Sequence, residues 1–177
     1  QYYHVRALNN LENNFVWPNG TPCFQGDTLK RLDCVAIAGD IFDKALDETH
    51  SLYKERYHQV NGEDDKKIKY PVFPGFGNHD IDPVSKKPAD NLAGRKMNLA
   101  YMDSVLQAKL AKGEILSVDP ESRAYSWNIE DIHFVQMHTY AGDDHYCKGN
   151  SLEWLENDLR LYAAGGTPVV YIQNYGF

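Results

Sequence analysis

Apolar residues gather along the chain in short continuous runs and in longer periodic segments, and the two kinds alternate. The runs over 34–38 and 71–76 are typical of buried strands, because each is short and is followed by a glycine. The segments 45–60 and 95–113 carry apolar residues near helical spacing, which predicts two helices. The stretch 81–94, rich in Pro and Gly, predicts a long loop of the kind that lines a site.

Four further elements follow in the second half of the chain. They are a strand over 124–129, a strand over 132–140, a helix over 152–164 and a strand over 168–173. Glu130 and Asp131 leave room for a tight hairpin turn, and Ser151 is expected to cap the helix. This order predicts a layered α/β sheet with flanking helices, partly parallel and including a β-hairpin. The helix over 95–113 is expected to bury Met97, Leu99, Met102, Leu106 and Leu110.

Composition limits what such a chain can do. Its 177 residues fit a single domain over 1–177, with 42% hydrophobic and 24% charged residues, as in ordinary globular proteins. The net charge of −7 argues against non-specific binding to nucleic acid, and no apolar run approaches the roughly 20 residues of a bilayer-spanning helix. Three cysteines are too few for a disulfide scaffold. Both ends of the chain look cut, so we expect a fragment whose compartment and oligomeric state stay open.

Polar side chains stand where the two predicted buried strands end. Asp40 follows the first strand and Asn78 the second, each directly after a glycine. In an open α/β sheet, ligands bind beyond the carboxyl ends of the strands, so these side chains are expected to meet in one crevice. Two oxygen ligands there suit a divalent cation, with His79 and Asp80 beside it as a proton donor and the group that orients it. The plainer alternative is that Asp40 and Asn78 only cap turns.

The stretches "AGDIFD" and "GNHD", in this order and at this spacing, resemble the motifs of the calcineurin-like metallophosphoesterase superfamily. The predicted hairpin and the segment "SLEWLENDL" are also similar to elements of that superfamily. The resemblance extends from about residue 30 to the end of the chain. It implies a layered metallophosphoesterase-like fold, incomplete at both ends.

The resemblance also implies roles for individual residues. Asp40 would bridge two metal ions, and Asn78 would bind the second ion and a phosphoryl oxygen. His79 would act near the leaving group, and Asp80 would hold the orientation of His79. Asp43 matches the last residue of its motif, whose role is more often in loop structure, and it is kept as a candidate for substrate contact.

Such a centre has a clear physical purpose. Two divalent cations, here manganese, iron or zinc, neutralise the anionic oxygens of a phosphoester and lower the pKa of bound water toward ~7. A protonated imidazole beside the leaving oxygen adds on the order of 10²–10⁴ in rate. The expected activity is therefore the hydrolysis of a phosphomonoester or phosphodiester. The sequence does not select the substrate.

Two motifs of the superfamily are missing, and a third position departs from it. The early Asp-x-His and the late Gly-His-x-His are absent, and Asn174 stands where relatives often carry a histidine ligand. Asn174 is retained as a metal-ligand candidate, although an amide binds zinc or iron less well than imidazole does. A catalytically impaired binding or regulatory module is therefore the alternative to an enzyme.

The other histidines carry weaker expectations. His138, near the carboxyl end of its strand, is a candidate for substrate contact, whereas His133 is expected to be packed or hydrogen-bonded. His50 and His58 are expected on the surface of their helix. His145 lies in a stretch with two aspartates, which is more simply a solvated loop than a second metal site.

Overall fold

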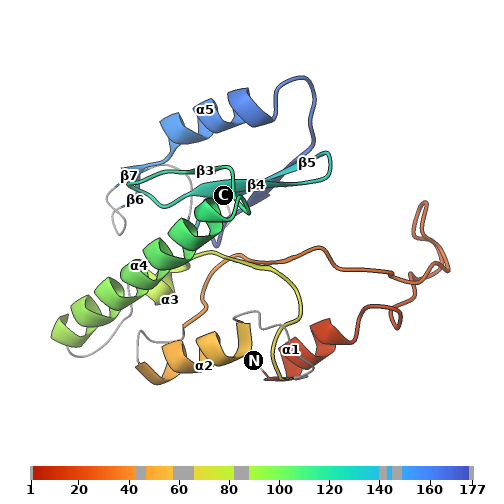
Figure 1. Ribbon diagram of the computed structural model, residues 1–177, viewed down its shortest axis with the longest axis horizontal. Coiled ribbons are helices and arrows are strands. Elements are labelled where there is room, and N and C mark those ends of the chain that lie inside the picture. The colour runs from red at the N-terminus through yellow and green to blue at the C-terminus, as the bar shows by residue number, and fades with distance from the viewer. Residues whose placement is uncertain are drawn as a thin grey trace. The chain divides into compact units, whose positions relative to one another are not determined.

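The computed structural model describes most of the chain (Figure 1). The described residues are 2–42, 47–57, 66–81, 88–139, 143–144 and 149–175. Two compact units make up the chain: Gln1–Ala36 with Ser51–Phe73, and Ile37–His50 with Pro74–Phe177. Among the helices described, none has the length and apolar character needed to cross a membrane.

The elements form a mixed α/β structure with parallel and antiparallel strand pairs, which confirms the predicted fold class. The helices are α1 (Tyr2–Asn9), α2 (Asp47–Tyr57), α3 (Asn78–Ile81), α4 (Pro88–Ala111) and α5 (Leu152–Tyr162). The strands are β1 (Val35–Ile37), β2 (Val72–Pro74), β3 (Ser117–Val118), β4 (Tyr125–Ile129), β5 (Ile132–Gln136), β6 (Asp143–Asp144), β7 (Gly149–Asn150) and β8 (Val169–Ile172). The described strands form sheets in the orders β1-β2, β3-β4-β5-β8 and β6-β7.

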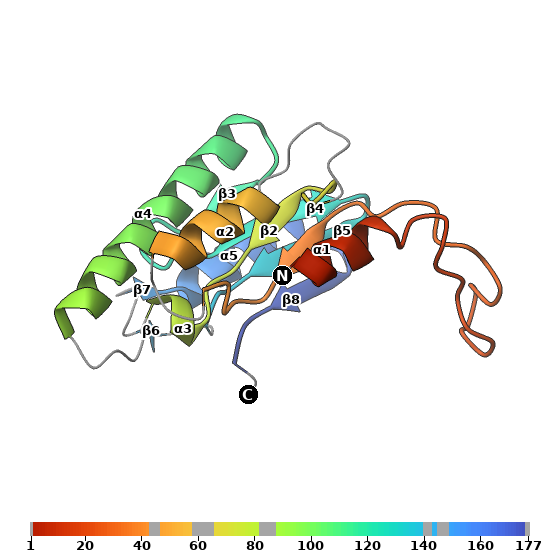
Figure 2. The same ribbon diagram turned by 90° about the horizontal axis from the view of Figure 1, so that it is seen from below.

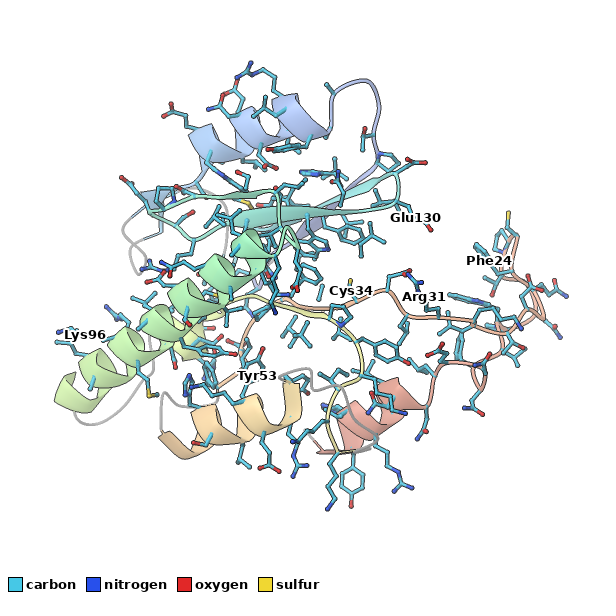
Figure 3. The ribbon with its side chains drawn as sticks, viewed as in Figure 1. Phe24, Arg31, Cys34, Tyr53, Lys96 and Glu130 are labelled. Atoms are coloured by element: carbon cyan, nitrogen blue, oxygen red, sulfur yellow. The ribbon has the colours of Figure 1, made fainter. Side chains whose placement is uncertain are left out.

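The four-stranded sheet contains the predicted hairpin. Strands β4 and β5 are antiparallel, and Ile129 pairs with Ile132 across the two-residue turn. Glu130, at the tip of this hairpin in Figure 3, has a positive φ of 50°, as tight hairpin turns require. Strand β8 lies parallel to β5, with His133 opposite Val169 (Figure 2). Parallel pairing of β5 and β8 is possible because α5 provides the crossover between them.

Helix α5 covers one face of this sheet (Figure 1). Its apolar side packs on a buried cluster made of Ala124, Val135 and Met137. The Trp154 side chain belongs to this contact, and its Nε1–H donates a 2.9 Å hydrogen bond to Ser117 Oγ. The apolar residues Trp154, Leu155 and Leu159 therefore attach the helix to the sheet.

A buried polar network also joins α5 to the hairpin. Asp158 is 2% exposed; its carboxylate accepts a 2.7 Å hydrogen bond from Ser126 Oγ and lies 2.8 Å from His133 Nε2. The other ring nitrogen of His133 lies 2.7 Å from Asn128 Oδ1. The prediction that His133 is a packed, hydrogen-bonded histidine is confirmed.

Helix α4 begins earlier than the sequence pattern predicts. Its first residue is Pro88, so the second half of the stretch 81–94 is helical and not loop. Proline suits the first helical position, because its missing N–H would have no partner there. Met102 and Leu106 are buried as expected, but Leu110 is 48% exposed because it lies in the last turn.

Two smaller predictions need correction. Ser151 occupies the N-cap position of α5, as predicted, but makes no side-chain capping hydrogen bond. His50, expected on the surface, is buried with its ring 5.3 Å from that of Phe42 and 4.7 Å from that of Tyr101. His58 lies outside the described residues.

The first unit contains α1 and an arm over 13–29. The Asn9 side chain joins α1 to a distant segment: it donates to Lys67 O at 2.7 Å and accepts from Lys69 N at 3.0 Å. The arm is closed by main-chain hydrogen bonds such as that from Asn13 N to Leu29 O. Phe24 lies near its tip (Figure 3).

Candidate functional site

The loops that follow β1 and β2 meet, as the two motifs predict. The strands are neighbours in their sheet, and each leads directly into one motif. The carboxylate of Asp40 accepts a 3.2 Å hydrogen bond from the main-chain N–H of His79. Asp40 therefore lies beside the peptide that joins Asn78 to His79.

Two glycines make this approach possible. A Cβ added at Gly77 would overlap the Asp40 carboxylate and lie 2.6 Å from Asp40 N. A Cβ added at Gly39 would overlap Gly77 N and lie 2.7 Å from Gly77 Cα. Gly39 also has a φ of +147°, which residues with side chains rarely adopt. The glycine before each ligand candidate is therefore needed for close packing of the two loops.

Asp80 joins the same two loops from the inside. Its side chain is fully buried and accepts hydrogen bonds from Gly77 N at 2.7 Å, Phe42 N at 2.7 Å and Ile41 N at 3.2 Å. Burial raises the pKa of Asp80 to about 6, although these three hydrogen bonds act in the opposite direction. The Asp80 carboxylate thus connects the main chain of the loop after β1 to that of the loop after β2. The expectation that Asp80 orients His79 stays a prediction.

Helix α4 holds the end of this motif. Asn98, fully buried, donates from Nδ2 to Asp80 O at 2.7 Å, and Arg95 Nε donates to Ile81 O. These side chains occupy carbonyls at the end of α3, which a helix this short cannot satisfy itself. The sequence reasoning missed Asn98. Its signal was a polar residue one turn before Met102, on the apolar side of the helix.

His138 lies inside the structure and is held by main-chain atoms on both sides of its ring. Its ring is buried, Nδ1 accepts a 3.1 Å hydrogen bond from Phe76 N, and Nε2 lies 2.7 Å from Arg123 O. Both ring nitrogens are therefore used by the main chain, and the substrate contact expected for His138 stays a prediction.

Asn174 follows the carboxyl end of β8, as the sequence predicts. Its main-chain N–H donates a 2.7 Å hydrogen bond to His138 O, and its side chain is partly exposed. Its role as a metal ligand stays a prediction. Asp43 and His145 lie outside the described residues.

The donor atoms of the site suit a hard cation. Asp40 and His79 are exposed and Asn78 is partly exposed, so their side chains are accessible to a ligand. Asp40 and Asn78 offer carboxylate and amide oxygens, which magnesium and manganese accept readily. Gln173 Oε1, next to Asn174 in the chain, is buried and has no hydrogen-bond partner among the described residues.

The same donors do not complete a centre for two ions. Within the described ranges, no group of three or more His, Cys, Asp or Glu side chains is placed to hold a metal. The residues therefore fit part of the ligand set of one cation, and a second ion requires further donors.

Comparison with known proteins identifies the family. The family model described as calcineurin-like phosphoesterase matches residues 7–176. No curated protein and no solved structure gives a significant match to the chain. The match extends over both compact units and includes both motif loops. The chain therefore belongs to the calcineurin-like phosphoesterase family.

Proposed function

We propose that this protein is a metal-dependent phosphoester hydrolase that acts on phosphomonoesters or phosphodiesters. Membership of the family indicates hydrolysis of this kind with divalent metal ions. The observation that carries the proposal is the contact between Asp40 and the Asn78–His79 peptide. This contact places the Asp40 carboxylate beside the main chain that carries Asn78, and the accessible side chains of both residues would bind a divalent cation.

The residues of the site would share the work as follows. Asp40 and Asn78 would bind the cations, manganese, iron or zinc, and Asn174 would contribute a third ligand from another loop. Divalent cations here supply neutralisation of the phosphoryl oxygens and a more acidic water. His79, exposed beside Asp40, would donate a proton to the leaving oxygen. The buried Asp80 would keep the two loops at a constant distance.

A catalytically impaired binding module is the second candidate. It is favoured by Asn174, an amide at a position where the family resemblance implies a histidine ligand, and by the incomplete ligand set of the described residues. Such a module would bind one cation without turnover. The two candidates therefore differ in hydrolysis and agree in metal binding.

Two measurements distinguish the hydrolase from the impaired binding module. Calorimetric titration with Mn²⁺ measures metal binding, and an assay on aryl phosphate mono- and diesters measures hydrolysis. We expect Asp40→Asn to abolish Mn²⁺ binding, because one of the ligands loses its charge. We expect His79→Asn to keep Mn²⁺ binding while turnover falls by about 10²–10⁴.

Glu130→Gln is the matched control, since it removes one carboxylate at the hairpin tip, in a different loop from both motifs. It should change neither quantity. Mn²⁺ binding without hydrolysis by the wild-type protein would favour the impaired module. Unchanged binding in Asp40→Asn would contradict the site itself.

A further inference from the structure

We propose that Gln136 and His138 are positioning residues that set the spacing of the three loops carrying Asp40, Asn78 and Asn174. This inference rests on the proposed function, because it concerns the ligand candidates of that site. Gln136 is the last residue of β5, and His138 follows two residues later. They are 0% and 1% exposed, so both lie beneath the surface that carries the ligand candidates.

Gln136 contacts the ends of both motif strands. Its Nε2 donates a 2.9 Å hydrogen bond to Ile37 O, the last residue of β1. A Cβ added at Gly75 would lie 2.5 Å from the same amide group. The Gln136 side chain is thus packed against the main chain that follows β2 while it is bonded to β1.

His138 joins the second motif to the third loop. Its Nδ1 accepts from Phe76 N at 3.1 Å, and its main-chain carbonyl accepts from Asn174 N at 2.7 Å. Because Nδ1 accepts from an N–H and Nε2 faces the carbonyl of Arg123, the ring carries its proton on Nε2. A positive φ of 61° at His138 lets the chain turn two residues after the strand ends.

The two residues also form a unit with each other. The main-chain N–H of His138 donates to Gln136 Oε1 at 3.2 Å. Gln136 bonds to the last residue of the strand before Asp40. His138 bonds to Phe76, between β2 and Asn78, and to Asn174 itself. One short segment at the end of β5 is therefore hydrogen-bonded close to Asp40 and Asn78 and directly to Asn174.

The bonds are costly to break because the groups are buried. A buried main-chain donor or acceptor that loses its partner costs about 1–3 kcal/mol. The loops consequently have little freedom to move while this unit is intact. Ligands of a cation must be held within about 0.5 Å of the productive geometry. Loss of the hydrogen bonds of Gln136 and His138 should therefore lower the affinity for the cation even in a variant that still folds.

His133 provides a matched control on the same strand. It is also a buried, doubly hydrogen-bonded histidine, but its partners are Asn128 and Asp158. Replacing it disturbs the β4–β5 hairpin and α5 and leaves each hydrogen bond of Gln136 and His138 in place. A role that is merely structural would make the two histidines equivalent.

The test measures Mn²⁺ affinity and melting temperature for the wild-type chain, His138→Leu, His138→Gln and His133→Gln. We expect His138→Leu to weaken Mn²⁺ binding by at least about tenfold. His138→Gln should recover most of the affinity, because a glutamine amide can accept from Phe76 N and donate to Arg123 O. His133→Gln should lower the melting temperature and leave the affinity unchanged.

Hydrogen exchange on the wild-type protein keeps the test open if His138→Leu does not fold. Addition of Mn²⁺ should slow hydrogen exchange of the Phe76 and Asn174 amides by the same factor. The exchange of the His133 amide, which bonds to Pro168 O, should slow by a smaller factor. Equal Mn²⁺ affinity in wild type and His138→Leu, or slowing of only one of the two amides, would overturn the inference alone. Absence of Mn²⁺ binding in the wild type would overturn it together with the proposed function.

Discussion

At the residue scale, the candidate site depends on the close packing of a few atoms in the two motif loops. The two motif loops approach so closely that neither Gly39 nor Gly77 has room for a methyl group. Asp40 accepts from His79 N across this contact, and Asp80 fastens the loops from the buried side. The positions of the ligand candidates therefore depend on residues that bear no ligand atoms.

Gly77→Ala tests this dependence. The new methyl group would overlap the Asp40 carboxylate, so the loops must separate, and we expect Mn²⁺ affinity to fall by tenfold or more in a calorimetric titration. Gly113→Ala is the control: no atom lies within 4 Å of its Cβ position, but its φ of +70° makes the substitution strained. It should cost about 1–2 kcal/mol of unfolding free energy without changing Mn²⁺ affinity. Equal affinities in both variants would contradict the close approach.

Asp80 predicts a pH dependence of stability in the metal-free protein. Its pKa in the folded state is about 6, against 3.8 for the free side chain, mainly because it is buried. The folded state then holds the proton more tightly than the unfolded state does, so stability falls as the pH rises from about 4 to about 7. The full effect is about 3 kcal/mol.

Urea unfolding in the presence of EDTA, at several values between pH 4 and pH 7, measures this effect. Asp80→Asn should remove that part of the slope, and Asp131→Asn, in the exposed hairpin turn, should keep it. The same slope in the wild type and Asp80→Asn would show that Asp80 is not its source.

At the scale of elements, the local sequence pattern predicts the β4–β5 hairpin and α5, but it does not predict how the two are attached to each other. The turn at Glu130 and the apolar face of α5 can be recognised from neighbouring residues alone. The network of Ser126, His133 and Asp158 cannot, because its members are up to 32 residues apart in the chain. A buried carboxylate in an amphipathic helix is the feature that joins the two elements.

Asp158→Ala should therefore be strongly destabilising. The change leaves His133 and Ser126 buried with a partner lost, and we expect a loss of about 3–5 kcal/mol in unfolding free energy by urea titration. Glu156→Ala, an exposed acid on the same helix, is the control and should change stability by less than about 0.5 kcal/mol. Similar losses in both variants would show that the network does not hold α5 to the sheet.

At the scale of the whole molecule, the family and the mixed α/β fold were both predictable. The order strand-GD then strand-GNHD led to the calcineurin-like family, and the family match over residues 7–176 confirms it. The prediction of one domain over 1–177 stays a prediction. The chain forms two compact units by the packing of its residues. The match continues through both units, so the division follows packing rather than family boundaries.

The errors of the sequence predictions have separate physical causes. The place of His50 on its helix does not show its burial, because Phe42 and Tyr101 come from other parts of the chain. The composition of 81–94 favours a loop, but proline also suits a first helical position, and α4 begins at Pro88.

The sequence by itself determined the order of the main strands and helices, the family and the chemical groups at the strand ends, because these depend on local pattern and on residue type. It did not show the short elements α1, α3, β3, β6 and β7. Only the tertiary structure decided which buried side chains hold that chemistry in place. Asp80, Asn98, Gln136 and His138 bond to main-chain atoms, and a main-chain atom has the same chemistry in every residue. A pattern of side chains in the sequence therefore cannot predict which main-chain atom such a side chain will bind in the folded protein.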